Sequence, residues 1–134
     1  MTAVSQKPQS QRARRAGWIL SGLAVLFLLF DTGMKVLGMR PAVDGSVQLG
    51  YPASTVLPIG LVELACLILY VFPATAPIGA VLFTGYLGGA VATHVRMGSP
   101  LFTHILFPVY VAGLLWTGLY LRDARVRALV SRSR

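Results

Sequence analysis

The sequence predicts an all-α fold, an integral membrane four-helix bundle with both termini on the cytoplasmic side. Of its 134 residues 55% are hydrophobic and only 12% are charged, whereas about a quarter of a soluble domain is charged. No Asp, Glu, Lys or Arg occurs between residues 64 and 95 or between 97 and 121. Uncharged apolar runs of about 18 residues or more are typical of membrane spans. The chain length allows one domain, which we assign to residues 16–122.

Basic residues at the two ends of the chain predict the topology. The first apolar run is preceded by Lys7, Arg12, Arg14 and Arg15, and the last apolar run is followed by Arg122, Arg125, Arg127, Arg132 and Arg134. Basic flanks stay cytoplasmic and contact anionic lipid. Neither basic segment has interleaved aromatic residues for base stacking, so the bilayer, and not a nucleic acid, is the expected partner.

The N-terminal part is expected to be a basic arm followed by the first span. Residues 1–15 are polar and basic, which predicts a disordered arm. A cleaved signal peptide is the alternative, but the following apolar run is longer than a typical signal, and we favour an uncleaved helix over residues 16–38. Trp18 suits an interfacial position. Asp31 and Lys35 share a helix face at i, i+4 spacing, which indicates either a structural ion pair or a functional site.

A segment rich in Pro, Gly and Ser over residues 39–55 separates the first two spans. It is predicted as a loop, in which a short strand and an amphipathic interfacial segment are both allowed. The second helix is predicted over residues 56–72, with Thr55 as its N-cap and Pro58 in its first turn. Glu63 is its one charged residue. The single Cys66 lies mid-span and is interpreted as a packing residue.

The last two spans follow tight turns. A helix over residues 76–96 carries the pair Gly85 and Gly89, a small-xxx-small pattern that lets another helix approach closely. A fourth helix is predicted over residues 100–121, and Pro108 should kink it. Residues 123–134 form a basic C-terminal tail.

The predicted topology brings the ionisable residues of the spans to similar depth. At about 1.5 Å of rise per residue, every one of them falls in the outer half: Asp31, Lys35, Glu63, His94, Arg96 and His104. We therefore propose a polar binding site there if these faces point inward. The histidines suit proton exchange at ordinary pH. No metal is expected, because the histidines lack metal-ligand spacing, and haem b between them has no supporting motif.

Three stretches carry a resemblance to a known family. They are residues 28–35 (LLFDTGMK), residues 47–52 (VQLGYP), and the long block 84–108 with His94, His104 and Pro108. Together they resemble the DoxX-like family of small bacterial membrane proteins, over about residues 18–125. The resemblance implies a multi-pass four-helix protein of the bacterial cytoplasmic (plasma, inner) membrane. Distant relatives include a subunit of a thiosulfate:quinone oxidoreductase, which implies a quinone as ligand and a membrane redox partner subunit.

Three functions remain open from the sequence. The first is the binding of a quinone-like or other hydrophobic molecule at the polar site. The second is a non-enzymatic accessory or scaffold subunit, whose charges would be buried ion pairs that fix helix register. The third is a small transporter, which would need a homo-oligomer because four short helices leave little room for a path. Whether the protein is an enzyme stays open, and no catalytic residue is assigned.

Overall fold

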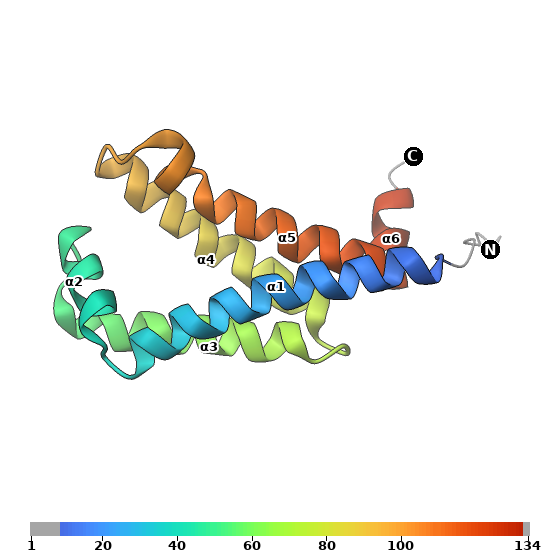
Figure 1. The fold of residues 1–134 in the computed structure, drawn as a ribbon, viewed down its shortest axis with the longest axis horizontal. Coiled ribbons are helices and arrows are strands. Elements are labelled where there is room, and N and C mark those ends of the chain that lie inside the picture. The colour runs from blue at the N-terminus through green and yellow to red at the C-terminus, as the bar shows by residue number, and fades with distance from the viewer. Residues whose placement is uncertain (1–8, 133–134) are drawn as a thin grey trace.

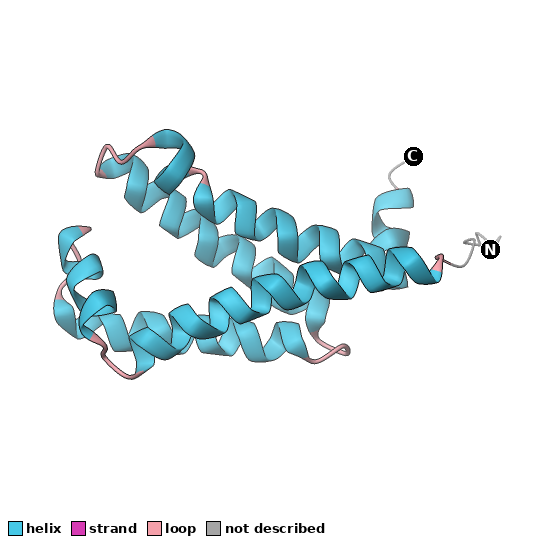
Figure 2. Cartoon of the chain, viewed as in Figure 1, coloured by secondary structure: helices cyan, strands magenta, loops and turns pink. Residues whose placement is uncertain are grey.

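The computed structural model describes residues 9–132, and this part of the chain consists of helices and turns without a strand (Figures 1 and 2). Four helical stretches are long and apolar enough to cross a membrane. They are α1 (Gln11–Val36), η1 with α3 (Ala53–Thr55 and Val56–Val71), α4 (Ala76–Arg96), and η2 with α5 (Leu101–Ile105 and Phe107–Arg122). Two shorter helices, α2 (Arg40–Gln48) and α6 (Ala124–Ser131), flank them. The prediction of a four-helix membrane bundle is confirmed.

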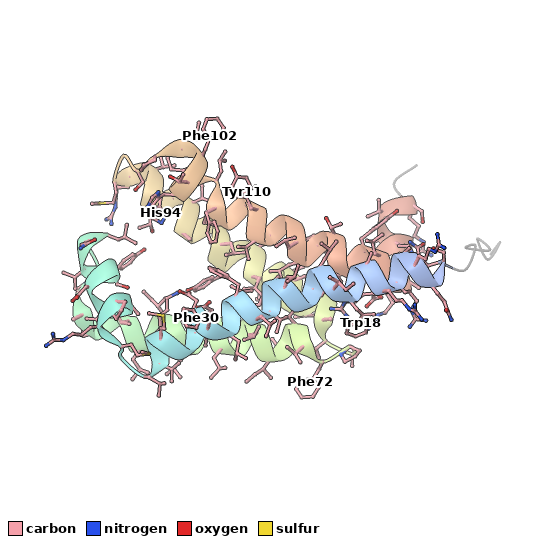
Figure 3. The ribbon with its side chains drawn as sticks, viewed as in Figure 1. Trp18, Phe30, Phe72, His94, Phe102 and Tyr110 are labelled. Atoms are coloured by element: carbon pink, nitrogen blue, oxygen red, sulfur yellow. The ribbon has the colours of Figure 1, made fainter. Side chains whose placement is uncertain are left out.

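The four spans pack as a ring. Helix α1 packs against α3 and α5, and α4 packs against the same two helices. A buried core fills the centre; its largest members are Tyr70, Phe83, Leu28, Leu115 and Leu119. Cys66 is buried in the same core. Large apolar side chains cover the outside of the spans, such as Phe30 and Phe102 (Figure 3), as a surface in contact with lipid requires.

The first helix begins earlier than the sequence predicts. Residues 11–15, which we expected in a disordered arm, form its first turn, and residues 1–8 lie outside the described part. The reason is an N-cap at Ser10, whose Oγ accepts a hydrogen bond from the Ala13 amide at 3.2 Å. At the other end Gly38 takes a φ of 63°, and the Met39 amide then bonds back to the Met34 carbonyl at 2.9 Å.

The segment after α1 is a short helix and not a strand. Helix α2 starts with Pro41 in its first turn, where a missing N–H costs nothing. None of its residues is buried. It ends before Gly50, whose φ is 90°. Helix α2 therefore covers one end of the bundle as a thin layer, and both chain termini lie at the opposite end (Figure 1).

The close helix contacts are made by other glycines than those expected. A Cβ on Gly17 would lie 2.7 Å from the Gly118 carbonyl oxygen, so α1 and α5 touch there backbone to backbone. Around Gly85 and Gly89, by contrast, a Cβ would meet no atom of the described residues within 4 Å. At Gly85 and Gly89 the predicted small-residue face of α4 thus packs closely against no other helix in the described part of the chain.

The fourth span is interrupted where the sequence predicts only a kink. Residues 101–105 form one wide π-turn, and α5 starts at Phe107 with Pro108 in its first turn. Proline lacks an N–H and tolerates a first turn better than a helix interior. The interruption sets η2, with His104, off from the axis of α5.

Candidate functional site

The polar residues selected from the sequence lie at the end of the bundle that carries α2 and η2. Each span contributes at least one of them: Asp31 and Lys35 in α1, Glu63 in α3, His94 and Arg96 in α4, and His104 in η2. The structure divides this set into an ion cluster around Lys35, a pair of histidines, and Arg96, which lies apart.

Lys35 is the centre of the ion cluster. Its Nζ forms an ion pair with Asp31 one turn earlier in α1 and donates to Glu63 Oε2 at 2.9 Å. It also donates to Tyr86 Oη at 2.8 Å, and Tyr86 in turn donates to Glu63 Oε2 at 3.0 Å. An ammonium group has three N–H donors, and all three are used. The cluster therefore joins α1, α3 and α4.

Glu63 is the buried anchor of this cluster. The residue is 0% exposed, so its charge depends on the lysine and on the tyrosine hydroxyl. Both of these donors bond to Oε2. Oε1 is buried and has no hydrogen-bond partner among the described residues. An unpaired buried acceptor costs about 1–3 kcal/mol, so the cluster keeps one acceptor open to a hydrogen-bond donor.

A cavity of about 300 Å³ opens beside the cluster. Lys35 and Tyr86 form one side, and the rest of the wall comes from α2, the segment after it, α3 and α4: Ser46, Leu49, Tyr51, Ile59, Gly89, Ala90, Thr93 and His94. A second hollow of about 470 Å³ adds Asp31 and His104. It shares five lining residues with the first: Lys35, Ser46, Leu49, Ala90 and His94. Volumes of this size suit small-molecule binding.

The two histidines meet at the edge of these hollows. Their ring centroids are 5.7 Å apart with an interplanar angle of 66°, and His94 lies near the end of α4 (Figure 3). The Nδ1 of His94 is 3.1 Å from Ser99 Oγ, and the Nδ1 of His104 is 2.8 Å from Thr103 Oγ1. Because each Nδ1 is engaged by a hydroxyl, each ring presents Nε2 as its remaining polar atom.

Arg96 does not join the cluster. Its Nη2 donates to the Leu49 carbonyl at 2.7 Å, and the side chain is therefore drawn toward the segment that follows α2. One turn earlier, Thr93 contacts Tyr51 of the same segment at 2.7 Å between their side-chain oxygens. Helix α2 and the segment 49–52 that follows it are called the cover of the cavity below. Arg96 thus holds this cover in place and does not line the cavity itself.

Sequence reasoning missed Tyr86, Tyr51 and Thr93. Tyr86 precedes His94 by eight residues, close to two helical turns, and both positions line the first cavity. A polar group at this spacing in an uncharged helix was the available signal. Tyr51 gave no such signal, because the alternation of Val47, Leu49 and Tyr51 allowed both a strand and an interfacial segment and did not place the hydroxyl at the cavity. Within residues 9–132 no group of three or more His, Cys, Asp or Glu side chains is placed to hold a metal ion.

Comparison with known proteins identifies a family. The model of the DoxX-like family matches residues 19–118, which include all four spans except residues 11–18 of α1 and residues 119–122 of α5. No curated protein and no solved structure matches the chain.

Proposed function

The chain belongs to the DoxX-like family, and we propose that it binds a quinone-like or other hydrophobic ring molecule in the cavity beside Lys35. The observation that carries the proposal is the composition of this cavity. Most of its surface is apolar, with Leu49, Ile59 and Ala90 in the wall. Polar groups come from Lys35, Tyr86 and His94 and from three further hydroxyl-bearing residues, Ser46, Tyr51 and Thr93. Apolar walls with a few oriented polar groups are typical of sites for small ring compounds.

The polar groups suit a ligand that carries ring oxygens. The Nε2 atoms of His94 and His104 can donate to a carbonyl oxygen, or accept from a hydroxyl, without breaking the bonds at Nδ1. Asp31 keeps its side chain 37% exposed beside the second hollow and offers a carboxylate for the exchange of protons. Lys35 is a less suitable direct partner, because its three N–H groups are already used.

The orientation follows from charge. Arginines cluster at the end that carries both termini, and the positive-inside rule assigns this end to the cytoplasm. The cavity would then lie on the outer side of a bacterial cytoplasmic membrane. A redox reaction at this site would need a membrane partner subunit that donates or accepts electrons.

The saturated lysine supports a second function, that of an accessory or scaffold subunit. Lys35 bonds to groups from α1, α3 and α4, and such a cluster can fix the register of three helices without binding a ligand. The idea that buried ion pairs give specificity holds in some proteins and fails in others. The two functions predict different results when the cavity is filled by a larger side chain: ligand binding weakens if the protein binds a ligand there, and is not affected if the cluster is only structural.

Filling the cavity at constant fold tests the proposal. Ala90 lines both hollows, whereas Ala92 is exposed on the same helix and lines neither. We expect Ala90→Leu to weaken the binding of short-chain ubiquinone or menaquinone analogues by about ten-fold or more, because a well-fitted site tolerates few added methylenes. Ala92→Leu should bind as the parent does, measured by calorimetry in detergent micelles.

Two results would contradict ligand binding. The first is that neither analogue binds the parent protein. The second is that Ala90→Leu and Ala92→Leu, both monodisperse and equally helical, bind with equal affinity. Either result would favour the scaffold function. His94→Ala should also weaken binding in a chain that remains folded, because its ring lies at the edge of the core and not within it.

A further inference from the structure

We propose a second binding site, for the phosphate of an anionic phospholipid, at the end of the bundle that carries both termini. Its central residue is Arg122, the last residue of α5. The site lies at the other end of the molecule from the cavity and does not depend on the function proposed above. Three observations carry it: the fixed position of the guanidinium, its unused donors, and the charge around it.

The guanidinium of Arg122 is held from two sides. Its Cζ lies 4.4 Å from the centroid of the Trp18 ring and 5.4 Å from that of Tyr70. Its Nε donates to Ser21 Oγ at 3.1 Å. Ser21 Oγ is in turn 2.9 Å from Tyr70 Oη, which donates to the Leu115 carbonyl at 2.8 Å. A cation stacked on an aromatic ring and tied to a buried hydroxyl loses little further freedom when it binds a ligand.

The outer edge of this guanidinium is unused. No described residue accepts a hydrogen bond from Nη1 or Nη2 of Arg122, and neither atom is a buried atom without a partner, so both reach the surface. A planar pair of N–H donors matches two oxygens of a phosphate. The structure thus presents an oriented fork that a phosphate group can complete.

The surrounding charge favours an anion. The same end carries the arginines of the first two turns of α1 and those of α6, such as Arg12, Arg15 and Arg127. The one carboxylate of α6 and its cap, Asp123, is already engaged by Arg125. Among residues 9–132, therefore, no acid competes for Arg122 near the site.

The depth of the site points to a lipid phosphate. Trp18 is 49% exposed, and an exposed tryptophan at the end of a span lies at the level of the lipid headgroups. Phe72, exposed at the same end of the bundle, extends the apolar surface below this level (Figure 3). A phospholipid whose phosphate is bound at Arg122 would have its acyl chains beside these apolar side chains.

Quenching of Trp18 by brominated lipid tests the site. The full chain carrying Trp116→Phe keeps Trp18 as its one tryptophan. In phosphatidylcholine vesicles that contain brominated phosphatidylglycerol, we expect the bromolipid to be enriched about five-fold at Trp18. This is the enrichment of anionic lipid that one arginine near the membrane surface produces. Arg122→Gln should abolish this enrichment. Arg12→Gln, which removes the same charge from an exposed side chain with no partner among the described residues, should retain most of it.

Three results with these variants would overturn the proposal. They are no enrichment at Trp18 over brominated phosphatidylcholine; equal losses in Arg122→Gln and Arg12→Gln, which would indicate a diffuse field; and release by inorganic phosphate beyond that by chloride of equal ionic strength, which would indicate a soluble anion. If Arg122→Gln does not fold, Arg122→Lys replaces it. Full enrichment in that variant would contradict recognition by the guanidinium fork, and a reduced enrichment would support it.

Discussion

The hydroxyl of Tyr51 lies 2.7 Å from the hydroxyl of Thr93 and joins the cover of the cavity to α4. Thr93 uses its own proton in a bond to the Gly89 carbonyl at 2.9 Å, so Tyr51 must be the donor. None of the residues of α2 is buried, so apolar packing holds the cover only weakly. Among the described residues, two hydrogen bonds link the cover to α4: this one and the one from Arg96 to the Leu49 carbonyl.

The first prediction follows from that bond. Tyr51→Phe removes the donor and keeps the ring. A net hydrogen bond contributes about 1 kcal/mol, so amide hydrogen exchange at Leu49, Gly50 and residue 51 should become about five-fold faster. Mass spectrometry of the peptide that contains them measures this rate.

Tyr120→Phe is the control for this prediction. It removes the same atom from a side chain that is 40% exposed and whose hydroxyl bonds to no described residue. Exchange in the cover should be unchanged in this variant. If Tyr51→Phe also leaves exchange unchanged, the cover is held by other contacts.

The second prediction concerns the charge balance around Lys35. Lys35→Met leaves Glu63 fully buried without its cation, and breaking a buried pair on one side costs about 3–5 kcal/mol. The double variant Lys35→Met with Glu63→Gln removes the stranded charge and should be clearly more stable than Lys35→Met alone. Unfolding by SDS in mixed micelles, followed by circular dichroism, measures both. Equal stability of the single and double variants would show that Glu63 carries no charge in the folded Lys35→Met variant.

The third prediction compares two glycines. A Cβ on Gly118 would lie 2.8 Å from the Ser21 amide nitrogen, so Gly118→Ala should force α5 away from α1 and cost about 1–3 kcal/mol. Gly85→Ala meets open space and should leave stability unchanged or raise it by up to about 1 kcal/mol through helix propensity. The same micelle titration compares them. Equal costs would mean that the face around Gly85 is packed against something outside this chain.

Sequence reasoning reached the four spans because their signals are local. The uncharged run before Arg96 and the tight turns before the last two spans depend only on neighbouring residues. It also grouped Asp31, Lys35 and Glu63 by depth, because rise per residue is constant along a helix. Hydropathy cannot tell which face of a helix is inside when all faces are apolar. For that reason the close glycine contact was assigned to Gly85 and not to Gly118.

The parts of the site that were missed depend on contacts between distant segments. Arg96 lies at the right depth, but its guanidinium binds the Leu49 carbonyl, a partner 47 residues away. Tyr86 has no charge to mark it, and it enters the cluster because α1 and α3 bring Lys35 and Glu63 beside it. These contacts depend on how distant segments pack together, which cannot be read from a single sequence.

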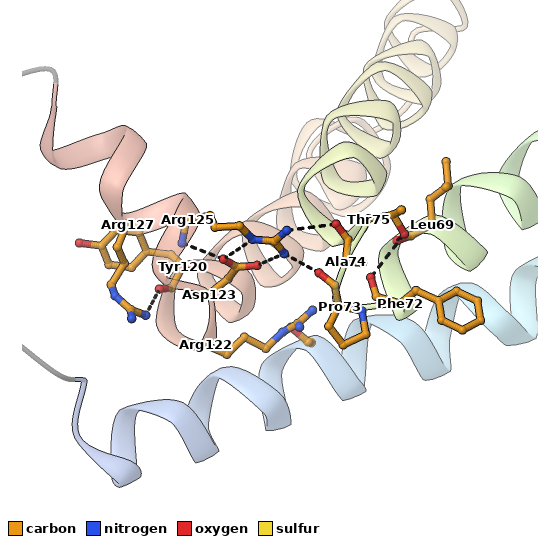
Figure 4. Close-up of polar contacts among 11 residues, drawn as sticks. Leu69, Phe72, Pro73, Ala74, Thr75, Tyr120, Arg122, Asp123, Arg125 and Arg127 are labelled. Carbon is orange, nitrogen blue, oxygen red and sulfur yellow. Dashed lines mark hydrogen bonds and ion pairs between the residues drawn. The ribbon is translucent and has the colours of Figure 1, made fainter. Parts of the chain in front are cut away.

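The fourth prediction concerns pH and the contact that ties α6 to the turn before α4. Arg125 donates to the Pro73 carbonyl at 2.5 Å, to the Ala74 carbonyl at 3.1 Å, and to Asp123 Oδ2 at 2.8 Å (Figure 4). The hydrogen bonds from Arg125 lower the pKa of the Asp123 carboxyl below its ordinary value, despite the opposing effect of partial burial.

A lowered folded-state pKa fixes the sign of the effect. The carboxylate stabilises the fold fully above the ordinary pKa of about 3.9, and this contribution is lost as the pH falls through the lower folded-state value. The melting temperature of the parent should therefore exceed that of Asp123→Asn at pH 6, and the two should converge as the pH falls below the ordinary carboxyl pKa and through the lower folded-state pKa. In an Arg125→Gln background the gap at pH 6 should narrow, because the donor that lowers the pKa is gone. A gap that is independent of pH would show that Asp123 acts only as the N-cap of α6 and not through its charge.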